Sequence, residues 1–167
     1  ARGIISGVSD LFFEPGRTMT RAEFAALVVR ALGLAPAGGA VFADVAATSW
    51  YADAVATAHA YGIVHGTSET TFTPGGTITR EQAAVMVAQA ARLCGLHTAP
   101  TATEIRDLLA QFPDYTSCSA WAGEPLAFCY QQAILSAEVL QIKPQEAITR
   151  AEIAAMVYRM LQKAALG

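Results

Sequence analysis

The sequence predicts an all-α protein in which tandem helix–loop–helix repeats pack as a bundle with approximate threefold internal symmetry. Three observations support this fold class. A Thr-Arg motif recurs at Arg21, Arg80 and Arg150, with separations of 59 and 70 residues (80 − 21 and 150 − 80). Apolar residues at a helical period follow each motif. Hydrophobic residues make up 53% of the chain, enough for a core, and alanine, which allows close helix packing, supplies much of that fraction.

Each Thr-Arg motif carries the residues of a capping box, in which a threonine and an acid or amide three residues later satisfy the first backbone N–H groups of a helix. The threonines are Thr20, Thr79 and Thr149, and their partners are Glu23, Gln82 and Glu152. The capping box does not explain the arginine. A cation in the first turn opposes the helix dipole, at a cost on the order of a few tenths of a kcal/mol. The repeated arginine therefore indicates a function.

The repeats divide the chain into five segments. They are a partial repeat at 1–34, a linker at 35–41, a second repeat at 42–96, a connector at 97–111 and a third repeat at 112–167. The full unit has an aromatic-x-Asp opening, a helix led by a tryptophan, a loop, a turn with proline and the capped helix. The first repeat starts at its loop, so we expect it to lack the leading helix and the natural chain to begin upstream. In the connector, the pattern Thr101-x-x-Glu104 predicts a short extra helix.

The capped helices each have one apolar face. Its residues are Phe24, Leu27, Val28, Ala31 and Leu32 in the first repeat, Ala83, Met86, Val87, Ala90 and Ala91 in the second, and Ile153, Met156, Val157, Met160 and Leu161 in the third. Three equivalent helices can bury these faces against one another, which favours the threefold bundle.

Composition and cysteine spacing exclude several classes. The net charge of −3 and 15% charged residues argue against a nucleic-acid partner. No apolar run reaches the roughly 18 residues of a membrane-spanning helix. The three cysteines lack metal-ligand spacing; we expect Cys94 in the core, and leave open a disulfide between Cys118 and Cys129 in an oxidising compartment.

The ordered elements resemble the S-layer homology family. The resemblance rests on Phe-x-Asp-Val before a tryptophan-led helix, a Gly-Ile-Val-x-Gly loop, an aromatic-x-Pro turn and Ile-Thr-Arg at the next helix, over nearly the whole chain. It implies three repeats folded as a three-pronged helical spindle. It also implies an extracellular module that anchors a bacterial surface protein to the cell wall without a covalent bond.

The resemblance implies, as ligand, a secondary cell-wall polysaccharide with pyruvylated N-acetylmannosamine, held in grooves between repeats by the motif arginine. Physical chemistry leads to a similar site: a helix N-terminus offers unpaired N–H groups, and a guanidinium matches a carboxylate. We therefore expect Arg21, Arg80 and Arg150 to bind a carboxylate. The alternative is that each arginine pairs with an acidic neighbour.

We expect the loop before each motif to face the ligand, because glycine lets a ligand approach the backbone closely. The glycines are Gly3, Gly7, Gly62 and Gly66. One loop position is polar in all three repeats, where it holds Ser6, His65 and Ser136. In the third loop Ala133 and Ala137 replace both glycines, so any positive φ there is strained. We therefore expect unequal sites, with the third loop serving the weakest groove and Arg80 contributing more than Arg150.

Two tryptophans are further candidates for ligand contact. Trp50 and Trp121 can stack on sugar rings, but each falls where a helix starts, so packing in the core is the preferred interpretation. Asp44 and Asp114, just upstream, are expected to cap or brace the opening of their repeats.

A protein-interaction or self-assembly scaffold with vestigial grooves is the alternative function. We expect no enzyme, cofactor or metal site. No Ser/His/Asp or Cys/His set recurs, there is no phosphate loop, and the run of acidic residues that a calcium-binding loop needs is absent.

Overall fold

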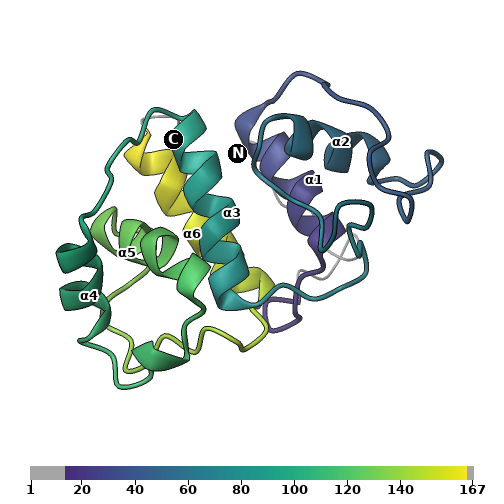
Figure 1. Ribbon diagram of the computed structural model, residues 1–167. Helices are drawn as coiled ribbons and strands as arrows, with labels where there is room; N and C mark the ends of the chain where they lie inside the picture. Colours follow the sequence, from purple (N-terminus) through teal and green to yellow (C-terminus); the bar gives the residue numbers. More distant parts are fainter. Residues whose placement is uncertain (1–13, 165–167) are drawn as a thin grey trace. The chain divides into compact units, whose positions relative to one another are not determined.

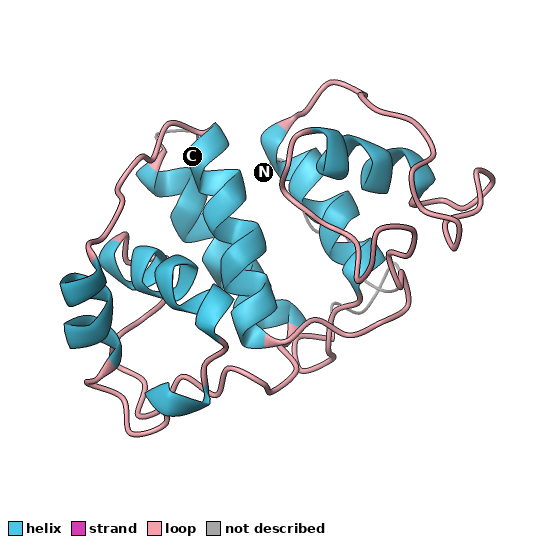
Figure 2. Cartoon of the chain, in the orientation of Figure 1, coloured by secondary structure: helices cyan, strands magenta, loops and turns pink. Residues whose placement is uncertain are grey.

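A computed structural model describes residues 14–164, which form α-helices and two short 3₁₀ helices with no β-strand among them (Figures 1 and 2). The all-α prediction is confirmed. The elements are α1 (Arg21–Leu32), α2 (Ala52–Ala60), α3 (Arg80–Leu93), α4 (Ala102–Leu109), η1 (Tyr115–Ser117), η2 (Ala120–Ala122), α5 (Gly123–Gln131) and α6 (Arg150–Lys163). The chain divides between Ile78 and Thr79 into two compact units, which are described separately. The threefold arrangement of the repeats stays a prediction.

All four capping boxes form as the sequence predicts. The N-cap hydroxyl accepts from the backbone of the third helical residue, whose own side chain accepts from the N-cap backbone, at α1, α3, α4 and α6. The short helix of the connector, α4, is thereby confirmed. The tryptophan-led helices begin later than expected, at Ala52 and Gly123, two residues after Trp50 and Trp121.

The predicted apolar faces form the core of both units. In the first unit α1 packs on α2. The fully buried side chains of this unit include Phe24, Val28, Val55 and Phe72. In the second unit α3 packs on α5 and α6, and α4 packs on α5 (Figure 1). Every residue of the three stripes is buried except Leu32, which is half-buried.

All three cysteines are free. Cys129 is buried in α5, where its Sγ lies 3.5 Å from the carbonyl oxygen of Ala84, and burial raises the pKa of its thiol. Cys118 is half-buried, and burial raises its pKa to about 11. Cys94 is the C-cap of α3 and half-buried, so its placement in the core is wrong. The thiols stay protonated at neutral pH, and the structure does not contain the disulfide between Cys118 and Cys129.

An aspartate braces the proline turn of each complete repeat. The carboxylate of Asp44 accepts hydrogen bonds from the amides of Phe72 (2.8 Å) and Thr73 (2.7 Å). Asp114 does the same for Ile142 (3.0 Å) and Lys143 (2.7 Å). The expectation that these aspartates cap or brace the opening of their repeats is wrong, because they brace a turn 28 and 29 residues downstream instead.

The braced turns hold strained backbone. Thr73 and Lys143 have φ values of +56° and +53°, in the left-handed region that side chains with a Cβ disfavour. Each residue also precedes a proline, which disfavours helical backbone further. Two hydrogen bonds to a carboxylate stabilise each turn against this strain.

The hydrogen bonds lower the pKa of both aspartates. The amides of Phe72 and Thr73 lower the pKa of Asp44. Burial alone would raise the pKa of Asp114, but the amides of Ile142 and Lys143 outweigh burial and lower it. Both carboxylates are therefore ionised, and better hydrogen-bond acceptors, throughout the neutral range.

Replacing Asp114 by asparagine should lower the free energy of unfolding by about 1–3 kcal/mol, because an amide cannot accept two charge-assisted hydrogen bonds. Asp107→Asn is the control, since among residues 14–164 that exposed carboxylate bonds only its neighbour Arg106. Urea denaturation measures both variants.

The Asp114 contribution should also depend on pH. A folded-state pKa below the unfolded value makes the stabilisation complete above the unfolded pKa, about 4, and removes it as pH falls through the folded pKa. The difference in the free energy of unfolding between Asp114→Asn and the wild type should therefore decrease as the pH falls through this acidic range. A difference unchanged between pH 7 and pH 2 would contradict the role of the charge.

The strain predicted for the third loop is confirmed at one of its two alanines. Ala133 has φ +54°, where the matching residue of the second repeat is Gly62 with φ +71°. At positive φ, a residue with a Cβ destabilises the folded state by roughly 1–2 kcal/mol. Glycine avoids this strain, but the greater chain entropy that it loses on folding costs about 0.5–1 kcal/mol.

Ala133→Gly should therefore stabilise the protein by about 0.5–1 kcal/mol. Ala137→Gly, at an exposed loop position without positive φ, should be neutral or destabilising. Thermal unfolding of both variants tests the assignment, and an equal effect of the two substitutions would refute it.

Candidate functional site

The N-termini of α1 and α3 dock on a proline turn. The amides of Arg21 and Ala22 donate to the carbonyl oxygens of Gly76 (2.9 Å) and Pro74 (3.0 Å). In the second unit, the amides of Arg80 and Glu81 donate in the same way to the backbone carbonyl oxygens of Glu146 (3.0 Å) and Pro144 (3.1 Å). The third amide of each helix is bonded to its N-cap threonine. The expected anion site on free helix amides is therefore wrong for α1 and α3, because the protein's own carbonyl groups occupy those donors.

The motif arginines reach the same turns. Nε of Arg21 donates to the carbonyl oxygen of Phe72 (2.7 Å), and Nε of Arg80 to that of Ile142 (3.2 Å). Both carbonyl groups belong to the repeat that follows the arginine. This pairing reverses the expectation that the loop before each arginine forms its pocket. The alanine-containing third loop consequently lies beside Arg80.

Arg21 is embedded in the first unit. Its residue is 5% exposed, Nη2 donates to the carbonyl oxygen of His65 at 2.5 Å, and the guanidinium lies 4.6 Å from the ring centroid of Phe72. Burial lowers its pKa, which the nearby Asp44 opposes. The guanidinium still carries its charge, since arginine does not lose its proton in proteins. Arg21 thus joins the helix start to the loop, and Arg150 is buried to the same extent.

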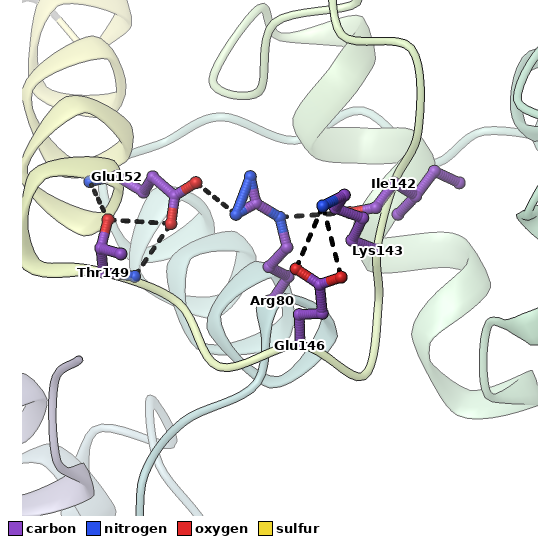
Figure 3. A network of polar contacts seen from close by, with 6 residues as sticks. All are labelled: Arg80, Ile142, Lys143, Glu146, Thr149 and Glu152. Atoms are coloured by element: carbon purple, nitrogen blue, oxygen red, sulfur yellow. Dashed lines mark hydrogen bonds and ion pairs between the residues drawn. The ribbon is translucent and has the colours of Figure 1, made fainter. Parts of the chain in front are cut away.

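Arg80 is more accessible and belongs to a polar network (Figure 3). Its Nη1 forms an ion pair with Glu152, the capping-box glutamate of α6. Burial would raise the pKa of Glu152, but hydrogen bonds from Thr149 and the charge of Arg80 outweigh it and lower the pKa. The acidic partner considered from the sequence is thus present at Arg80. Its Nη2 makes no hydrogen bond within residues 14–164 and remains a donor for a ligand.

A cavity of about 300 Å³ opens beside Arg80. Its polar lining comes from Arg80, Tyr130, Ser136, Gln141, Glu152 and Arg159, and its apolar lining includes Leu126, Leu135, Val139, Ile148 and Met156. Burial raises the pKa of Tyr130 to about 12, so its phenol stays a neutral hydrogen-bond donor. Mostly apolar walls with a few polar groups are typical of sites for small ligands.

The other predicted site residues differ in their placement. Ser136 lines the cavity, and the His65 side chain is exposed. Gly66 packs against its own loop: a Cβ there would lie 2.2 Å from the carbonyl oxygen of Ser68 and 2.6 Å from that of Thr71. Gly62 supplies positive φ. These glycines therefore shape the loop. Gly3, Ser6 and Gly7 lie outside the described residues.

Trp50 and Trp121 are exposed by 70% and 56%, so the prediction of core packing is wrong. Each precedes its α-helix instead of lying on the buried face. The ring of Trp50 contacts that of Tyr51 in an edge-on geometry at 5.3 Å. Stacking on sugar rings, the other interpretation, stays a prediction.

Three polar residues of the cavity lining were not singled out from the sequence: Tyr130, Gln141 and Arg159. A signal existed for Arg159. It lies nine residues after Arg150, as Arg30 lies nine residues after Arg21, and this repeat position indicates a shared role in the capped helices. Tyr130 and Gln141 have no such repeat signal.

Within the described range, no three His, Cys, Asp or Glu residues lie close enough to hold a metal ion. In the same range, no helix combines the length and the apolar character that crossing a membrane requires.

The sequence of this chain matches a known protein family. The model of the S-layer homology domain matches residues 1–25, 41–84 and 111–154. The chain is 33% identical over 165 residues to the exoglucanase XynX of Acetivibrio thermocellus and 34% identical over 165 residues to an amylopullulanase of Thermoanaerobacterium thermosulfurigenes. It is 30% identical over 164 residues to the surface-layer 125 kDa protein of Lysinibacillus sphaericus. The matches cover 98%, 98% and 96% of this chain but only 15%, 8% and 13% of those proteins.

Arg21→Ala should lower the free energy of unfolding by about 2–3 kcal/mol, because it leaves the carbonyl groups of Phe72 and His65 without their donors. Arg21→Lys should rescue little, since lysine lacks the planar fork. Arg106→Ala, on the exposed side of α4, should have a small effect, since its side chain is 68% exposed and pairs with the exposed Asp107. Urea denaturation measures all three; a loss below about 0.5 kcal/mol for Arg21→Ala would show that the guanidinium does not support the fold.

Proposed function

Since this chain belongs to the S-layer homology domain family, we propose that it is a module that anchors a larger bacterial surface protein to the cell wall without a covalent bond. The nature of the relatives supports this role. An exoglucanase, an amylopullulanase and a surface-layer protein have different activities, yet each contains a segment similar to nearly this whole chain. A segment shared by such proteins serves a need other than their separate activities, and the surface-layer relative points to retention at the cell surface.

The proposed ligand is an acidic secondary cell-wall polysaccharide, with a pyruvate ketal on N-acetylmannosamine as the acidic group. The observation that carries the proposal is the Arg80 cavity. Nη2 of Arg80 is a charged donor at its border, Ser136 and Gln141 supply neutral polar groups, and the other walls are largely apolar. A sugar with one carboxylate offers complementary groups: an anion for the guanidinium, hydroxyls for the polar side chains and ring faces for the apolar walls.

Arg21 and Arg150 are proposed as the corresponding residues of further grooves. Because Arg21 bonds two backbone carbonyl groups, substitutions there act on the fold as well as on binding. The exposed indoles of Trp50 and Trp121 are proposed as additional surfaces for sugar rings.

A protein-interaction or self-assembly scaffold is the second candidate. The observation that favours it is the third loop, where Val139 and Leu140 are 41% and 88% exposed. Two adjacent exposed aliphatic side chains are a small contact surface for another protein.

Arg80→Gln should reduce retention on purified, protein-free cell walls about tenfold or more, because it removes the cation at the cavity. Arg92→Gln is a matched control. Arg92 also pairs with a glutamate of the second unit, at 2.5 Å to Glu124, and its side chain is 28% exposed against 25% for Arg80, but it does not line the cavity.

Chemical removal of pyruvate from the walls should abolish the difference between the wild type and Arg80→Gln. Equal retention of the wild type before and after this treatment would refute the acidic-glycan proposal. Binding that needs surface proteins and is absent on protein-free walls would favour the scaffold.

A further inference from the structure

We propose that Arg159 is a second anchor for the acidic glycan in the Arg80 cavity, so that this cavity recognises two neighbouring sugar units. The inference rests on the proposed function and specifies how that same site selects its ligand.

The two arginines border the cavity at separate points. Arg80 is held at Glu152, near the start of α6, and Arg159 lies on the same helix seven residues later. Seven residues of α-helix rise roughly 10 Å. This rise exceeds the width of one pyranose ring, so we infer that the sugar next to the one at Arg80 is the one that contacts Arg159.

The charges of the cavity leave Arg159 without an acidic partner. Among the described residues that line it, the charged ones are Arg80, Glu152 and Arg159, and Glu152, the single carboxylate of these three, is paired with Arg80. Nη1 of Arg159 donates to the carbonyl oxygen of Ile134 at 3.3 Å, beyond the usual range for such bonds. Its other N–H groups make no hydrogen bond within residues 14–164, so they are available to carboxylate, carbonyl or hydroxyl oxygens of a ligand.

The wall between the two arginines suits a sugar chain. Met156 lies on α6 between Glu152 and Arg159, and Val139 and Ser136 of the third loop line the same cavity. Apolar side chains can pack on ring faces while the serine hydroxyl bonds to ring substituents. The cavity of about 300 Å³ thus has two arginines in its lining and apolar side chains that a sugar ring can contact.

The second anchor is a feature of particular repeats. The position nine residues after the motif arginine holds Arg159 in α6 but Gln89 in α3. A charged ligand contact from this position therefore requires an arginine at it. In the cavity of Arg80, helix α6 supplies that arginine, Arg159.

The test compares two probes by calorimetric titration: pyruvylated N-acetylmannosamine as a monosaccharide, and a wall disaccharide that carries the same group. Arg159→Gln should weaken disaccharide binding about tenfold, the effect of losing one charge-assisted hydrogen bond, and leave monosaccharide binding within about twofold. Arg159→Lys should restore part of the loss. Arg92→Gln should change neither affinity, and thermal unfolding checks that the variants are folded.

The outcomes separate this inference from the proposed function. Equal losses for both probes in Arg159→Gln, or no loss for either, would overturn the second anchor while Arg80 remains the carboxylate ligand. Full binding of both probes by Arg80→Gln would overturn the proposed function itself.

Discussion

Docking of a helix start on the proline turn of the next repeat is the interaction on which the described structure depends. The first two amides of α1 and α3 donate to carbonyl groups of the turn, and Nε of the motif arginine donates to a third carbonyl. An aspartate from the opening of the same repeat then holds the turn through two amides. The first amides of any helix have no hydrogen-bond partner within the helix and normally bond to water. Here they bond to the turn of the next repeat, so they join successive repeats.

This joint explains why an arginine is placed where the helix dipole disfavours it. The cation lies beside carbonyl oxygens, which are partial negative charges, and in the second unit beside Glu152. These contacts offset the cost of the dipole. In the first unit they bury Arg21 almost completely. In the second unit they leave Arg80 at the border of a cavity, so the same motif residue supports the fold in one place and is available to a ligand in the other.

Sequence reasoning was most accurate where neighbours along the chain decide the outcome. The four capping boxes, the short α4 and the strain at Ala133 depend on residues within a few positions of one another. It was less accurate for Trp50 and Trp121, because the first turn of each helix begins two residues after the tryptophan and turns the indole away from the buried face. It also missed Arg159 as a cavity residue, although its repeat position carried a signal.

The sequence by itself determined the all-α class, the repeats, the starts of the four capped helices and their buried apolar faces. Hydrophobic period and capping are local properties of the chain, so they can be recognised without the fold. Only the tertiary structure decided which loop meets which arginine. The bonds from Arg21 to Phe72 and from Arg80 to Ile142 join residues 51 and 62 positions apart, and nothing local specifies such a pairing. The candidate site depends on that pairing, which places Arg80, the third loop and Arg159 around one cavity.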